Sequence, residues 1–387
     1  MSLPLLKRRP DRGLGNIGSS PADPSRNIDW VLLGTQAVLA TIGLFIVYST
    51  SRMRVPGDPF YYTTRQLIFT IVATFVMFVV MSIDYVQWKD RIRLLYALTI
   101  VSLVLLKLLS LSTGRDLITF ELGPINVQPQ ELAKVTVLLA LAVYLSEERS
   151  EQVSYPRFLG GLLVVGAPAL LTLVQPDMGS AIMLIVMVMG VMVVAGAKFR
   201  YLVMITALSA VSIAAAFVTR IVNEYQIERL RVFLDPDTTN PDLVDASYQV
   251  RNSIRAVGTG GLFGKGWLQG PLTEGGDIPV MWADFPFAAV AEEFGFVGSA
   301  LLIGVFVLAL VRIWRIAHLS RDLMGTYICA GVFTMLLFQV FQNVGMTLGI
   351  MPVTGLPLPF ISYGGTGQLT WFIMFGLVQS VYMRRMR

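Results

Sequence analysis

The chain has 387 residues, of which 55% are hydrophobic and only 14% are charged, and its mean hydropathy is +0.66. This composition excludes a water-soluble globular domain and is typical of an integral membrane protein. The cations behind the net charge of +5 are scattered between apolar stretches, so we expect no nucleic-acid binding. With one histidine and one cysteine, the chain also lacks the residues for a His/Cys metal site.

Ten apolar runs follow one another along the chain, each close to the roughly 20 residues that a helix needs to cross a bilayer. They cover residues 28–50, 65–83, 94–112, 129–146, 159–175, 179–196, 201–221, 285–311, 324–350 and 366–383. The sequence therefore predicts an all-α integral membrane protein, a polytopic bundle of about ten transmembrane helices. Since no linker or repeat divides it, we expect residues 28–387 to form a single domain.

The distribution of cations predicts the orientation of the bundle. Residues 1–27 are rich in Pro, Gly, Ser and Arg and lack the apolar stretch of a signal peptide, so we expect a disordered cytoplasmic tail. Most of the 30 Lys and Arg residues lie in this tail and in the short loops on its side of the bundle. By the positive-inside rule both termini are cytoplasmic, and the long polar loop between spans seven and eight, residues 222–284, is extracytoplasmic.

Several segments interrupt the helical pattern at membrane depth. Pro168 lies inside a span, Gln175–Gly179 forms a tight turn, and Met351–Phe360 is too rich in proline to be helical. Backbone groups freed in this way must be satisfied by protein or by water in a cavity. We therefore expect Met351–Phe360 to be a re-entrant or interfacial segment that lines a cavity.

Glu131 and Lys134 are the first charged residues to weigh. They stand three apart at a helix start that also carries Pro129, so the two side chains share one face and can neutralise each other. Two readings stay open: the pair fastens helices together, or it contributes to a substrate site.

Asp284 lies directly before an apolar run and after the long polar loop, which places a carboxylate at a boundary between water and lipid. An ionisable group at such a boundary is costly unless it has a partner or a chemical role. Its position before Phe285-Pro286 also fits a simple helix cap. Asp177, in a Pro-Asp-Met-Gly turn, is expected to cap the next helix.

The stretch Asn343–Gly365 closely resembles the signature of the SEDS (shape, elongation, division and sporulation) family. Four further blocks agree with that family and occur in the expected order: Gln128–Lys134, Gln175–Asp177, Gly260–Leu268 and Ala283–Gly298. The resemblance extends over most of the chain. Within the family, Gly264-Lys265-Gly266-Trp267-Leu268 is similar to the rod-elongation branch, whereas division-type members more often read Gly-Val-Gly-Leu-Gly there.

This resemblance implies a peptidoglycan glycosyltransferase that polymerises lipid II into glycan strands and releases undecaprenyl diphosphate. It implies that Asp284 is the general base, which accepts the proton of the attacking sugar hydroxyl. Because the substrates carry a diphosphate, the site needs cations near headgroup level, and the candidates for substrate binding are Lys134 with Glu131, Arg229, Arg231, Lys265 and Ser362. A divalent cation, Mg²⁺ or Mn²⁺, could share this task, although the sequence offers no dedicated cage of ligands.

The same resemblance implies a place and partners. We expect a multi-pass protein of the bacterial cytoplasmic membrane, in contact with lipid II, the growing glycan strand and membrane lipids. A class B penicillin-binding transpeptidase and other membrane proteins of the elongation complex are the expected protein partners, the transpeptidase being contacted through spans eight and nine and the outer loops.

One departure from the family pattern lies beside the expected base. The common Leu-Pro-Glu-x-His-Thr-Asp is replaced by Ile278–Asp284, which lacks the usual Glu, His and Thr. Two other functions stay open. A flippase for the same precursor would also need broken helices and buried charges, and a non-catalytic scaffold of the cell-wall complex would leave Asp284 as a helix cap.

Overall fold

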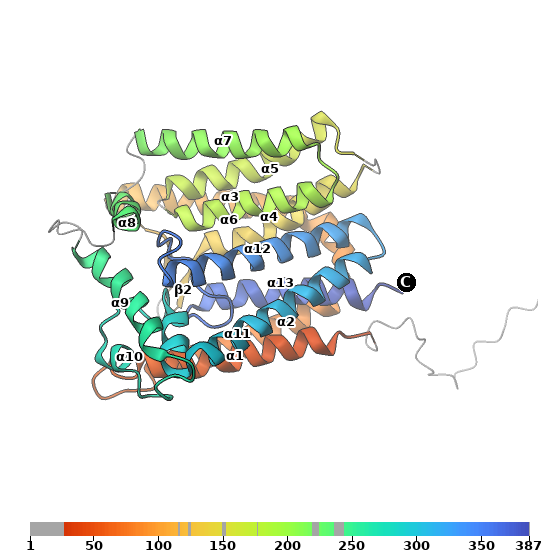
Figure 1. Cartoon of the computed structure of the whole chain (residues 1–387). Helices are drawn as coiled ribbons and strands as arrows, with labels where there is room; N and C mark the ends of the chain where they lie inside the picture. The colour runs from red at the N-terminus through yellow and green to blue at the C-terminus, as the bar shows by residue number, and fades with distance from the viewer. Residues whose placement is uncertain are drawn as a thin grey trace, which may run out of the picture.

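The structure is a computed structural model, and it describes residues 27–114, 117–122, 125–148, 152–175, 177–218, 224–235 and 244–386. The expected tail therefore lies almost wholly outside the described residues. The long helices lie side by side as a bundle, while α8, α9, α10 and strand β2 lie together at the end opposite the C-terminus (Figure 1). We refer to this end as the loop end.

The described helices and strands are α1 (Trp30–Ser51), α2 (Tyr61–Ser82), the 3-10 helix η2 (Tyr85–Gln87), α3 (Trp88–Thr113), β1 (Phe120–Leu122), β2 (Ile125–Val127), α4 (Pro129–Ser146), α5 (Tyr155–Val174), α6 (Met178–Val194), α7 (Phe199–Val218), α8 (Glu224–Leu234), α9 (Val244–Gly260), α10 (Pro271–Gly275), α11 (Pro286–His318), α12 (Leu323–Thr347) and α13 (Gly365–Met383). Helices α1 to α7 and α11 to α13 coincide with the ten predicted apolar runs. Seven of them, in the described part of the chain, are long and apolar enough to cross a membrane.

The other three of the ten are α6, α7 and α13. The first two are also apolar helices, α6 with 17 residues and α7 with 20. Helix α13 packs against α2 and α4 and is buried along most of its length, with Gln368, Gln379 and Ser380 among its buried residues. A helix enclosed by other helices can carry such polar side chains, because they find partners in the protein rather than facing lipid.

Two features of the loop end were not expected from the sequence. Strands β1 and β2 form a two-stranded antiparallel sheet in which Phe120 pairs with Val127, so the fold is not purely α-helical. The long loop, 222–284, contains helices α8, α9 and α10. Helices α8 and α9 are amphipathic and mostly polar, so a search for apolar runs could not find them.

Capping and chain breaks fix where the spans begin and end. The Asp177 carboxylate accepts a hydrogen bond from Ser180 N at 2.9 Å, so the expected cap is confirmed. Helix α11 is broken at Gly295, whose φ of 67° belongs to the left-handed region that favours glycine. At the break, the segment Gly260–Gly266 pairs with α11: Lys265 N donates to the Glu292 carbonyl, and Phe296 N donates to the Gly261 carbonyl, both at 2.9 Å.

The proline-rich segment 351–360 is non-helical, as predicted, and it lies against α12. Amide side chains of α12 satisfy its freed carbonyls: Gln342 donates to Pro352 O, and Asn343 donates to Leu356 O, each at 2.9 Å. The segment also packs against α1, where Gly43 lies directly beneath the Phe360 carbonyl. These contacts hold an irregular backbone inside the bundle, where it can line a cavity.

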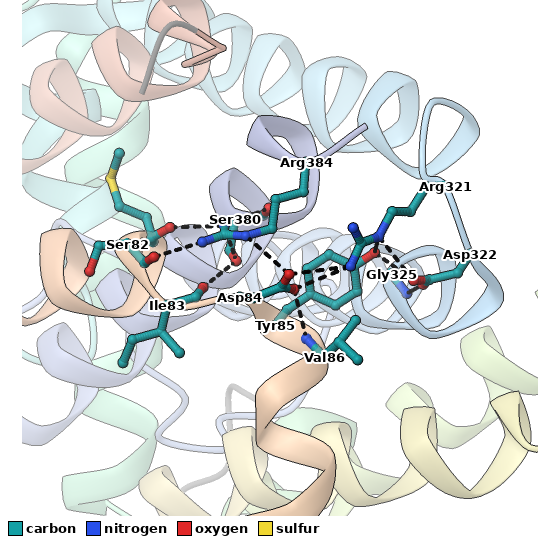
Figure 2. A network of polar contacts seen from close by, with 11 residues as sticks. Ser82, Ile83, Asp84, Tyr85, Val86, Arg321, Asp322, Gly325, Ser380 and Arg384 are labelled. Carbon is teal, nitrogen blue, oxygen red and sulfur yellow. Dashed lines mark hydrogen bonds and ion pairs between the residues drawn. The ribbon is translucent and has the colours of Figure 1, made fainter. Parts of the chain in front are cut away.

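The opposite end of the bundle is held by a polar network (Figure 2). The Arg384 guanidinium, on the last turn beyond α13, donates to the carbonyl of Ser82 at 2.6 Å and pairs with Asp84 at 3.5 Å. Arg321, between α11 and α12, also pairs with Asp84 and donates to the Tyr85 hydroxyl. The network therefore joins the α2–α3 connection, the α11–α12 connection and the end of α13, opposite the loop end.

Candidate active site

A cavity of about 180 Å³ opens at the loop end, where α4, α13, the turn before α11 and the irregular segment meet. Its lining is Gln128, Glu131, Ala283, Asp284, Gly355, Pro357, Leu358, Pro359, Phe360, Ser362, Tyr363, Gly364, Gly367, Gln368 and Trp371. The structure thus brings together three segments that the sequence singled out separately: the start of α4, the Asp284 turn and the proline-rich stretch.

Asp284 lies in the turn that precedes α11. Its backbone is fixed from both sides, because Asp284 N donates to Val280 O at 3.1 Å and Asn343 Nδ2 donates to Asp284 O at 2.9 Å. The N-cap of α11 is Phe285, and no side chain caps this helix. The Asp284 carboxylate is therefore not used as a helix cap, and it lines the cavity instead.

The electrostatic surroundings of Asp284 favour a proton acceptor. Burial raises the pKa of the Asp284 carboxyl above its ordinary value, because the charged form loses its hydration, and the Arg229 guanidinium partly lowers it. Arg229, on α8, donates to the Val353 carbonyl at 3.4 Å and reaches the cavity wall at Gly355. A cation from the polar loop thus lies beside the carboxylate that the sequence singled out.

Glu131 and Lys134 form a buried ion pair on α4, with side-chain exposures of 4% and 1%. Glu131 lines the cavity, and only one of its two carboxylate oxygens has a hydrogen-bond partner in the described part of the chain. This second oxygen lies close to Gly367, where an added Cβ atom would be 3.9 Å from it. Glu131 is therefore a charged part of the cavity lining, while Lys134 pairs with it from outside that lining.

The remaining predicted residues are placed differently. Ser362 lines the cavity, but its hydroxyl accepts a hydrogen bond from Leu358 N at 2.7 Å and so supports the turn of the irregular segment. Arg231 lies on the exposed side of α8, and the Lys265 side chain is exposed beside the break in α11. Neither belongs to the cavity lining.

Sequence reasoning missed the aromatic residues at the mouth of the cavity. Tyr363 lines the cavity, and its backbone N donates to the Trp282 carbonyl at 2.9 Å. Tyr62 contacts both rings, with centroids 5.1 Å from each. Only the position of Tyr363 within the signature stretch could have drawn attention to it, because the three residues are far apart in sequence.

No cluster of three or more His, Cys, Asp or Glu side chains occurs among the residues that the structure describes. The cavity contains two carboxylates, those of Glu131 and Asp284. Mg²⁺ is commonly held by one or two carboxylates together with substrate phosphates, so this lining fits a cation that arrives with a diphosphate better than a resident metal.

A family model for FtsW, RodA and SpoVE, described as cell cycle protein, matches residues 29–387. The chain belongs to this family, the SEDS family. The resemblance of the signature stretch is thereby confirmed over almost the whole sequence. Membership also supports the coarser prediction of fold, an all-α polytopic membrane protein apart from its small sheet.

Similar SEDS proteins include stage V sporulation protein E of Bacillus subtilis, which is 32% identical over 360 residues, covering 91% of this chain and 96% of the relative. The peptidoglycan glycosyltransferase RodA of Treponema pallidum is 28% identical, covering 93% of this chain and 98% of the relative. Relatives named for sporulation and for rod shape thus match to a similar degree.

A solved structure with the same fold comes from work described as "Structural coordination of polymerization and crosslinking by a peptidoglycan synthase complex". Its chain is 29% identical to this one and superposes with a TM-score of 0.75. The match covers 92% of this chain and 98% of that chain. The bundle described above is therefore the fold of an established member of a peptidoglycan-synthesising assembly.

Proposed function

We propose that this SEDS chain polymerises lipid II into glycan strands, with Asp284 as the general base. Membership of the family makes the chain a peptidoglycan glycosyltransferase, the activity by which its relatives are named. The observation that carries the assignment of the base is the position of Asp284: a carboxylate with a raised pKa that is not used as a helix cap and that lines a cavity beside Arg229.

In the proposed reaction, the hydroxyl of an acceptor sugar attacks the anomeric carbon of a lipid-linked donor. A carbon–oxygen bond forms there, and the bond from that carbon to the diphosphate oxygen breaks, so undecaprenyl diphosphate leaves with the bonding electrons. The Asp284 carboxylate takes the hydroxyl proton and later returns it to water. A raised pKa makes the carboxylate a better proton acceptor, provided that it stays ionised at the working pH.

Two cations close to the cavity lining are suited to the diphosphate. Arg229 lies beside Gly355, and Lys134 pairs with Glu131; both partners line the cavity. A planar guanidinium can bind two phosphate oxygens at once, whereas the ammonium of Lys134 acts as a point charge. Were a divalent cation, Mg²⁺ or Mn²⁺, to arrive with the diphosphate, the carboxylate of Glu131 would help to hold it, and it would supply charge neutralisation of the leaving group. Arg231, Lys265 and Ser362 remain candidates for the rim of the site.

We place the loop end outside the cytoplasmic membrane, with both termini in the cytoplasm, because most cations lie at the other end of the bundle. Single cysteines test this orientation, since the native Cys329 is buried. In intact cells, Lys265→Cys should react with a membrane-impermeant maleimide, and Lys198→Cys should react only after the membrane is opened. The reverse pattern would overturn the orientation.

Within the family, we propose the elongation branch, on the sequence Gly264–Leu268. Similarity to relatives named for rod shape and for sporulation leaves this choice to experiment. A class B penicillin-binding transpeptidase is the proposed partner, because the similar solved chain comes from an assembly described as coordinating polymerisation and crosslinking. Co-purification with the elongation transpeptidase rather than the division transpeptidase of the same cell would support the branch, and the opposite preference would reject it.

A flippase and a scaffold are the competing functions, and one assay separates them. Purified protein is given fluorescent lipid II, and the products are analysed on gels. The proposal requires glycan chains with the native protein and none with Asp284→Asn. Translocation of lipid II across vesicles without any chains would favour the flippase. If folded protein supplied with its transpeptidase partner neither forms chains nor translocates lipid II, the scaffold is favoured.

A further inference from the structure

Four aromatic residues, Tyr61, Tyr62, Trp282 and Tyr363, form a continuous cluster at the mouth of the cavity. We call this cluster the aromatic platform. The Tyr62 centroid lies 5.1 Å from those of Tyr61, Trp282 and Tyr363, with interplanar angles of 84°, 36° and 89°. All four side chains are partly exposed, so the platform has ring surface that the protein itself does not cover.

Two residues of the platform connect it to the proposed base. Trp282 is two residues before Asp284, and Tyr363 belongs to the lining of the same cavity. The hydrogen bond from Tyr363 N to Trp282 O joins the two strands of chain that carry these rings. The platform therefore adjoins the cavity that Asp284 and Tyr363 both line.

Two arginines flank the rings. The Arg54 guanidinium lies 5.2 Å from the Trp282 ring centroid, and it is fixed by bonds to the carbonyls of Gly276 and Ile278 at 3.1 and 3.2 Å. The Arg65 guanidinium lies 4.2 Å from the Tyr61 centroid. The surface thus combines ring faces with directional donors of hydrogen bonds.

A pyranose ring matches this combination. One face of the sugar is lined by C–H groups, which pack on an aromatic ring, while its rim of hydroxyl and acetamido oxygens accepts hydrogen bonds from arginine. A phosphate or a lipid tail fits less well, since the former has no apolar face and the latter offers nothing to the guanidinium groups.

An aromatic belt at the membrane surface is the simpler explanation for such residues. The same end of the bundle contains a cluster that fits this description: Trp267 with Phe45 and Tyr48, in which Trp267 is 38% and Phe45 is 51% exposed. The platform differs because one of its rings, Tyr363, lines the cavity, whereas no residue of the Trp267 cluster does. Trp267 therefore serves as a matched control for Trp282.

We propose that the aromatic platform is the binding site for the acceptor sugar, a hexosamine whose hydroxyl it presents to Asp284. This inference rests on the proposed function and assigns one substrate to one side of the cavity. It also gives a role to Trp282, which stands in the segment where this chain lacks the usual Glu, His and Thr of the family. Here a ring takes part in positioning a sugar beside the base.

The test measures binding of a sugar that lacks both lipid and diphosphate. Full-length protein carrying Asp284→Asn is placed in nanodiscs with N,N′-diacetylchitobiose, and saturation-transfer NMR gives the affinity. The Asp284→Asn background excludes turnover, so the result does not depend on whether Asp284 is the base. Trp282→Leu should weaken binding about tenfold, as expected for one lost stacking contact, while Trp267→Leu leaves it unchanged and Trp282→Phe restores most of it.

Two results would overturn the proposal. Equal affinity in Trp282→Leu and Trp267→Leu would mean that the rings form only a membrane-surface belt. No saturation transfer to chitobiose at tens of millimolar would mean that the platform binds no hexosamine. Failure of the proposed function would look different: polymerisation would persist in Asp284→Asn, whatever the sugar binding shows.

Discussion

The buried pair of Glu131 and Lys134 allows a sharp test of whether its charges serve the fold, the reaction or both. The perturbation is a double-mutant cycle of Glu131→Leu, Lys134→Met and the two together. Because the side chains are only 4% and 1% exposed, removing one partner leaves the other buried and uncompensated. Breaking such a pair costs about 3–5 kcal/mol, whereas replacing both partners with apolar residues is often close to neutral.

The expected order of stability is therefore native, then the double variant, then each single variant, with the singles lower by about 3–5 kcal/mol. Thermal unfolding in detergent, followed by tryptophan fluorescence, gives the order, and polymerisation of lipid II by the same samples gives activity. The double variant should be folded but inactive, because the bundle keeps its packing while the charges of Glu131 and Lys134 are lost. Native activity in the double variant, or single variants as stable as the native protein, would refute this reasoning.

Two further changes probe the Asp284 turn and the wall of the cavity. Arg229→Gln removes a cation that lowers the pKa of Asp284, so this pKa rises. Because the base must be ionised to act, the acid limb of the pH–rate profile moves to higher pH. An unmoved limb would mean that Arg229 does not act on the base. Gly43→Ala places a methyl group against the Phe360 carbonyl and should cost about 1–3 kcal/mol and lower activity. Gly34→Ala, in the same helix but with open space around it, should cost almost nothing, and equal losses in the two variants would contradict the close packing described for Gly43.

Much of the bundle could be predicted because its signal is local. Apolar runs located every long helix, with bounds that differ by up to seven residues, at the end of α11, and the proline-rich stretch 351–360 was recognisable as irregular from its composition alone. The pairing of Glu131 with Lys134 followed from their spacing on one helix face. The comparisons confirm the family that the signature indicated.

The features that could not be predicted depend on contacts between distant parts of the chain. Helices α8 and α9 are too polar for a hydropathy search, and strands β1 and β2 are only three residues each, too short for a pattern of alternating polarity to identify them. The platform joins Tyr62, Trp282 and Tyr363, which only the packing of α2 against α13 and the loop brings together. A helix cap and a catalytic carboxylate at Asp284 looked alike in sequence, and the geometry of the turn excludes the cap.

The central claim is that the Asp284 carboxylate accepts a proton during glycosyl transfer. The most direct measurement is the turnover of lipid II by purified Asp284→Asn, alongside its lipid II affinity and its thermal stability. We expect a fall in turnover of about 10²- to 10⁴-fold, with affinity and stability close to native, because the amide keeps the shape of the side chain but cannot take the proton. Turnover within a few-fold of the native rate would contradict it.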